Sequence, residues 1–208
     1  MSRRIAAALS CGAAVMLAQG ACAQVSTDVT KAPSGTYRLQ SSHSQLLFSI
    51  LHIGLTDYYG RFDHLSGTLN FDSVHPQNSA VSIAVDTASV DTTSPQLNMD
   101  LKSADVFDAD KYPQAVFKSV SVVRTGATAG TIVGDLTLHG VTKRVSLDAT
   151  FSGGELDPLT SNYAIGFRAS GTIKRTDFGL TGMPWEPMVG DDVTLIIQAM
   201  FDQENNPT

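Results

Sequence analysis

Cysteine is nearly absent from this sequence. Its 208 residues include two cysteines, Cys11 and Cys22, and both lie close to the N-terminus. If a segment that contains them is removed, the remaining chain has no disulfide, no thiolate nucleophile and no cysteine-based metal site. Basic residues are also in the minority, with 14 Lys and Arg against 20 Asp and Glu, and they form no cluster. This acidic balance argues against a nucleic-acid partner.

The N-terminal segment has the pattern of a secretory signal peptide. Arg3 and Arg4 precede an apolar run over residues 5–17, which is shorter than the roughly 20 residues that span a bilayer. An Ala-Cys-Ala cleavage pattern ends the segment. We expect residues 1–23 to be removed on export, so that the protein is not an integral membrane protein. The paired arginines leave both the general secretory and the twin-arginine routes open.

The rest of the chain is expected to form one domain. Residues 24–34 are small and polar and predict a flexible leader. Residues 35–203 are long enough for a sizeable core, and residues 204–208 form a tail.

Apolar and polar side chains alternate along most of the domain. In residues 144–151 every second side chain is apolar, the period of a half-buried strand. The pair His139-Gly140 lies between two such runs and predicts a hairpin turn. Strands are expected around 36–40, 44–53, 60–71, 79–89, 114–124, 131–140, 143–153, 162–175 and 192–202.

One segment breaks the alternation and predicts a short helix. Ser94 is a good N-cap, Pro95 suits the first helical position, and Leu97 and Leu101 would share one face. A second brief turn is expected at 55–59. With eight to ten antiparallel strands and so little helix, the chain is all-β, a sandwich or a barrel. A barrel of about eight strands can hold one small ligand.

The residue types that usually act in catalysis or bind metals form no recognisable motif. The five histidines, His43, His52, His64, His75 and His139, show neither HxH nor HExxH spacing, and there is no GxSxG motif. On a regular strand, His43 and His52 would point to opposite faces. We expect His43 to hydrogen-bond with Ser44 where the strand begins. No metal, no cofactor and no catalytic residue is therefore predicted.

Residues 43–54 are apolar on both faces of the expected strand. One face carries Leu46, Phe48, Ile50 and His52. The other carries Leu47 and Leu51, although the outside of a barrel is normally polar. We expect Leu47 and Leu51 to be covered by the short helix, by a loop or by a second subunit of a homodimer.

The order of several motifs resembles the YceI-like family, also called the lipid or polyisoprenoid-binding-like family. The resemblance covers residues 35–202 and is carried by His43-Ser44, His52-x-Gly54, Gly60-Arg61-Phe62, the run GDLTLHGVTKRVSL from Gly134, Arg175-x-Asp177-Phe178-Gly179 and Val189-Gly190-Asp191. It implies an eight-stranded antiparallel, lipocalin-like barrel in the periplasm. Its apolar cavity would bind a polyisoprenoid or another long-chain lipid without catalysis. The family usually has an acid where this chain has Gln40.

If the barrel binds a lipid as the resemblance implies, we expect specific residues to contact the ligand. The expected cavity wall consists of Leu46, Phe48, Ile50, His52, Phe117, Leu136, Leu138, Leu147, Phe167 and Ile173. Arg61 and Arg168 are candidates for head-group contacts, and His52 either joins them or bonds only to nearby backbone. Trp185 is expected to shape the cavity mouth.

Two other functions remain open at this point. A barrel filled by its own side chains would favour an interaction module that docks an envelope partner through outward apolar residues. An enzyme that hydrolyses a lipid head group is the third alternative.

Overall fold

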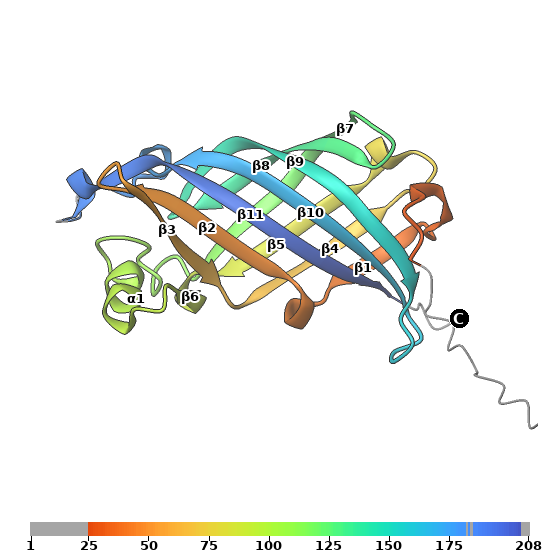
Figure 1. Ribbon diagram of the computed structural model, residues 1–208, viewed down its shortest axis with the longest axis horizontal. Helices are drawn as coiled ribbons and strands as arrows, with labels where there is room; N and C mark the ends of the chain where they lie inside the picture. Colours follow the sequence, from red (N-terminus) through yellow and green to blue (C-terminus); the bar gives the residue numbers. More distant parts are fainter. Residues whose placement is uncertain (1–24, 182, 184, 205–208) are drawn as a thin grey trace, which may run out of the picture.

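Strands make up most of the described chain, which the computed structural model gives as residues 25–181, 183 and 185–204 (Figure 1). The strands are β1 (Gly35–Leu39), β2 (Gln45–His52), β3 (Thr56–Phe62), β4 (Leu65–Phe71), β5 (Ala80–Asp86), β6 (Val90–Asp91), β7 (Gln114–Arg124), β8 (Ala129–Leu138), β9 (Val141–Leu156), β10 (Tyr163–Lys174) and β11 (Val189–Gln203). The helical segments are α1 (Pro95–Lys102), η1 (Val29–Lys31), η2 (Ser41–His43), η3 (Pro76–Asn78), η4 (Thr87–Ser89), η5 (Arg175–Phe178) and η6 (Glu186–Met188).

The strands close into an antiparallel barrel. Its ring runs β1-β4-β5-β7-β8-β9-β10-β11, and β11 pairs back to β1, so that eight strands close the sheet. Closure removes the free edges that would otherwise pair with other chains. The expected eight-stranded antiparallel barrel is confirmed, with α1 lying beside β6 at one end (Figure 1).

Several barrel strands are interrupted. β11 is long enough to pair with β1 through Phe201 and with β2 through Ile196, so β1 and β2 act as one strand broken by η2. β3 and β4 are likewise separated at residues 63–64, so the single strand expected over 60–71 is wrong in detail. The turn expected at 55–59 is also wrong, because the turn lies at residues 53–55 and β3 begins at Thr56.

Two local predictions are confirmed. The turn between β8 and β9 places His139 and Gly140 at φ 51° and 75°, the left-handed pair that a tight hairpin requires. Helix α1 begins where predicted, and the Ser94 side chain accepts a hydrogen bond from the Leu97 backbone N–H at 3.4 Å.

The barrel interior contains two hydrophobic clusters. One surrounds the fully buried Tyr37 and includes Phe71, Phe151 and Phe201. The other surrounds Phe178 and includes members from β8, β9, β10 and the segment after α1. Much of the interior is therefore filled by side chains.

The segment before β1 packs onto the barrel. Val29 and Ala32 are buried in the Tyr37 cluster, and the Tyr37 hydroxyl donates a 2.7 Å hydrogen bond to the carbonyl of Pro33. Ser26 forms an isolated bridge with Gly154 of β9. This differs from the expected flexible leader, because two small apolar side chains in a polar stretch suffice to anchor it.

The remaining predictions about the ends lie largely outside the described residues. The proposed signal peptide, residues 1–23, and the tail beyond Glu204 belong to the parts of the chain that are not described. Within the described part, no helix is long and apolar enough to cross a membrane.

Candidate ligand cavity

A cavity of about 170 Å³ lies inside the barrel next to the Tyr37 cluster and is partly open to solvent. Its wall comes from the barrel strands, from η1 and η3, and from the turn between β7 and β8. The two short helices and this turn lie towards the right of Figure 1. Among the described residues that line it, the polar side chains are Ser79, Arg124 and Thr128, and none is a carboxylate. The cavity is therefore suited to an apolar ligand.

A row of small residues leaves this space empty. Gly130 on β8 pairs with Ala149 on β9, which pairs with Ala169 on β10, and all three line the cavity. The row ends at Arg124 on β7 and at Ile197 on β11. Large side chains at the three central positions would fill the barrel, whereas glycine and alanine leave room for a ligand.

Phenylalanine rings form another part of the wall. The ring of Phe167 lies 5.4 Å from that of Phe151 and 6.2 Å from those of Phe71 and Phe201, measured between centroids. All four residues line the cavity. Their edge-to-face packing gives this wall a defined, rigid shape.

A β-bulge turns Arg124 towards the cavity. Ser119 faces Gly134 of β8 and Ser121 faces Val133, so Val120 is one extra residue on β7. Before the bulge Phe117 lines the cavity; after it, the lining residues are Val122 and Arg124. An extra residue reverses which alternate side chains point inward. Regular alternation from Phe117 would have placed Arg124 outside, so sequence reasoning missed it.

The expected wall residues fall into three groups. Phe117, Leu147 and Phe167 line the cavity. A second group also packs into the interior clusters but not around the cavity: Leu46, Phe48, Leu136, Leu138 and Ile173. Ile50 and His52 are partly buried near the far end of β2 and are not among the described lining residues. Whether any of these residues contacts a ligand stays a prediction.

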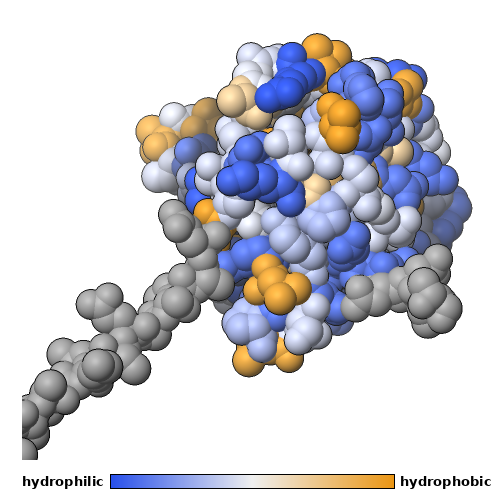
Figure 2. Space-filling view, turned by 90° about the vertical axis from the view of Figure 1, so that its right-hand side faces the viewer, coloured by the Kyte–Doolittle hydropathy of each residue, from blue (hydrophilic) through white to orange (hydrophobic). Residues whose placement is uncertain are grey.

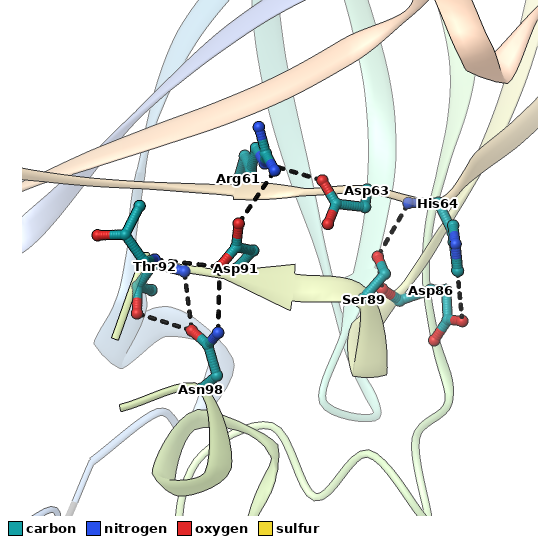
Figure 3. A network of polar contacts seen from close by, with 9 residues as sticks. Arg61, Asp63, His64, Asp86, Ser89, Asp91, Thr92 and Asn98 are labelled. Carbon is teal, nitrogen blue, oxygen red and sulfur yellow. Dashed lines mark hydrogen bonds and ion pairs between the residues drawn. The ribbon is translucent and has the colours of Figure 1, made fainter. Parts of the chain in front are cut away.

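The two arginines expected to contact a head group lie elsewhere. Arg61 is 57% exposed and pairs with Asp63 at 2.8 Å and Asp91 at 3.1 Å (Figure 3). Arg168 is exposed on β10. Neither is among the described residues that line the cavity. Their head-group role stays a prediction that this placement does not support.

The network around Arg61 fastens α1 to the barrel. Asn98 of α1 accepts hydrogen bonds from the backbone N–H and the hydroxyl of Thr92, at 2.8 and 2.7 Å, and donates to Asp91 at 3.1 Å (Figure 3). Thr92 is buried, so these bonds satisfy groups that water does not reach. We infer that these bonds hold α1 in place on the barrel.

The histidines do not meet in one site. His43 is exposed in η2, where its Nδ1 lies 3.1 Å from the Ser42 hydroxyl, and His139 Nδ1 lies 3.3 Å from the carbonyl of Phe178. Ser44 is buried and bonds to the backbone of Met200, so the expected pairing of Ser44 with His43 is wrong. Among the described residues no three His, Cys, Asp or Glu side chains are placed to hold a metal.

Gln40 stands where the resemblance to the family led us to expect an acid. Its amide donates a 2.9 Å hydrogen bond to the carboxylate of Asp202. Burial, together with the charge of Asp157, raises the pKa of Asp202, although His43 and Gln40 oppose the shift. A second acid at position 40 would add repulsion, which the amide avoids.

The outward apolar residues of β2 are covered unequally. Leu47 is partly buried, whereas Leu51 is 45% exposed. The expected cover of Leu51 by another part of the chain is absent in the described residues, which leaves a second subunit as the remaining prediction. Trp185 packs against the Phe178 cluster and does not line the cavity.

The barrel and its apolar cavity place the protein in the class of lipocalin-like barrels. A model of the YceI-like domain matches residues 37–201, and the chain therefore belongs to the YceI-like family. Relatives include UPF0312 proteins from Pectobacterium atrosepticum, 41% identical over 68% of this chain and 73% of the relative, and from Ectopseudomonas mendocina, 40% identical over 68% and 74%.

Solved structures share the same architecture. The Campylobacter jejuni YceI protein superposes with a TM-score of 0.66 at 27% identity, covering 74% of this chain and 90% of that one. Burkholderia cenocepacia BcnA gives 0.71 at 22% identity over 78% and 98%. A polyisoprenoid binding domain from Saccharophagus degradans gives 0.62 at 16% identity over 83% and 100%. The last two show the likeness of fold alone.

Proposed function

We propose that the protein is a periplasmic carrier or sequestering protein that holds one long apolar chain, of the polyisoprenoid or fatty type, inside its barrel without catalysis. The observation that carries the proposal is the cavity, whose wall is apolar except for Ser79, Arg124 and Thr128. Burial of about ten methylenes would contribute roughly 8 kcal/mol before the cost of association. An apolar chain therefore needs few polar contacts to bind.

Two further points support a lipid ligand. The Saccharophagus degradans neighbour is described as a polyisoprenoid binding domain and has the same fold. The apolar run and the cleavage pattern at the start of the sequence fit export, which would bring the protein to an envelope that contains such lipids.

Mass spectrometry of the protein purified from its native host without detergent tests this function. The expected result is one dominant long-chain species, near one molecule per protein. Absence of any co-purified chain, together with no binding of polyprenols in titration, would contradict the proposal. A screen for lipid hydrolysis is expected to give no turnover, and turnover that depends on His43 or His52 would favour an enzyme instead.

A second candidate function is the docking of a partner. Ile53 and Leu55 at the tip of the β2–β3 turn are 54% and 76% exposed, close to the exposed Leu51. Exposed apolar residues grouped in this way mark interaction surfaces. Solution scattering compared between the wild type and Leu55→Asp distinguishes a homodimer through this turn from a monomer. If the wild type and the Leu55→Asp variant are both monomers and bind ligand equally, a homodimer through this turn is ruled out.

A further inference from the structure

We propose that the ligand of the cavity carries an anionic head group, a phosphate or a carboxylate, and that Arg124 binds it. The inference rests on the proposed function and adds the chemical class of the ligand. The bulge at Val120 places Arg124, the last residue of β7, among the residues that line the cavity.

The Arg124 side chain is held in place by its own turn. Its Nε donates to the carbonyl of Gly126 at 2.8 Å, and its Nη2 donates to the carbonyl of Ala127 at 3.0 Å. A guanidinium has five N–H groups, so three remain for a ligand. The two carbonyls orient the group without neutralising its charge.

The charge of Arg124 has no carboxylate partner in the described part of the chain. Several other cations there are paired: Arg38 with Glu204, Arg144 with Asp135, Lys174 with Asp192 and Arg175 with Glu186. The described residues that line the cavity include two other polar side chains, Ser79 and Thr128, and are otherwise apolar. An exposed arginine that lacks a carboxylate partner at such a site has the chemistry that recognises phosphate or carboxylate.

The other polar groups of the cavity lie towards the same end. Ser79 follows η3, and Thr128 belongs to the turn between β7 and β8, next to Arg124 in sequence. The surface on this side of the molecule is mostly hydrophilic and carries only separate hydrophobic residues (Figure 2). A head group at the mouth would therefore meet polar surroundings while its chain lies among the phenylalanines.

The test compares matched ligands that differ only in the head group. The purified protein is titrated by calorimetry with farnesol, farnesyl phosphate, dodecanol and dodecanoate. We expect at least one anion to bind about tenfold more tightly than its neutral alcohol, as hydrogen bonds to a charged group imply. A higher affinity for the phosphate than for farnesol, for the carboxylate than for dodecanol, or for both, identifies the head group.

The variant Arg124→Gln is expected to remove this gain, so that each anion binds no more tightly than its matched alcohol. Lys118→Gln removes a charge from an exposed position of the same strand and is expected to keep the gain. The inference is overturned if alcohols and anions bind equally, or if Arg124→Gln keeps the preference. If the alcohols also fail to bind, the proposed function itself fails.

Discussion

The ring of Phe117 on β7 lies over Gly134 on β8, in the space that a side chain at position 134 would fill. A Cβ there would lie 2.6 Å from the carbonyl oxygen of Lys118 and closer still to the Phe117 ring. The two residues belong to adjacent strands and lie near the cavity, since Phe117 is part of its wall. The missing side chain therefore sets the position of a cavity-wall ring.

Gly134→Ala is expected to destabilise the protein. The added methyl meets backbone on one side and an aromatic ring on the other, and overpacking of this kind costs about 1–3 kcal/mol. Urea unfolding would show a lower midpoint. Gly166→Ala is the matched control, because its Cβ would lie 3.6 Å from the Ser152 Cβ, an ordinary van der Waals distance. Equal stabilities of the two variants would contradict the packing described.

Asn98→Ala is expected to lower the free energy of unfolding by about 1–3 kcal/mol, because it leaves the buried backbone N–H of Thr92 without its partner. Gln96→Ala on the same helix removes only an exposed bond to Asp100, and its effect should stay within about 0.5 kcal/mol. Urea unfolding of both variants measures the difference. A loss at Gln96 as large as that at Asn98 would refute the role of the network.

Asp202→Asn is expected to gain stability relative to the wild type as the pH rises from about 4 to 7. The pKa of Asp202 is raised on folding, mainly by burial, so its carboxyl favours the folded state below its ordinary pKa, near 4, and loses that contribution as it ionises. An asparagine still accepts the bond from Gln40. Thermal unfolding as a function of pH measures the effect.

Asp72→Asn gives the control of opposite sign. Hydrogen bonds, first from the His75 backbone N–H, lower the pKa of Asp72, so its carboxylate stabilises the fold above the ordinary pKa and ceases to do so as the pH falls. This variant should lose relative stability as the pH rises. Parallel pH dependences in the two variants would contradict the assignment.

Much of the barrel could be predicted from the sequence because its strands are regular where they are long. Alternation predicted the interior positions of Leu136, Leu138 and Leu147, and the turn at His139-Gly140 follows from local backbone chemistry. Period and turn residues are local signals, and a single sequence contains them directly.

The cavity itself could not be predicted in this way. Its empty space comes from Gly130, Ala149 and Ala169, which are far apart in the sequence and meet only through strand pairing. The bulge at Val120 reverses the inward face of β7, and no local residue pattern marks its position. The anchoring of the N-terminal segment by Val29 likewise depends on a contact with the finished barrel.

The most direct test of the central claim, that an apolar chain binds between these strands, is a titration of Ala149→Phe with geranylgeraniol. Ala149 lies in the middle of the small-residue row, so a ring there occupies the cavity. We expect the affinity to fall roughly tenfold or more, while Val123→Phe, which adds the same ring at a position 54% exposed, binds like the wild type. Unchanged binding by a folded Ala149→Phe variant would contradict the account.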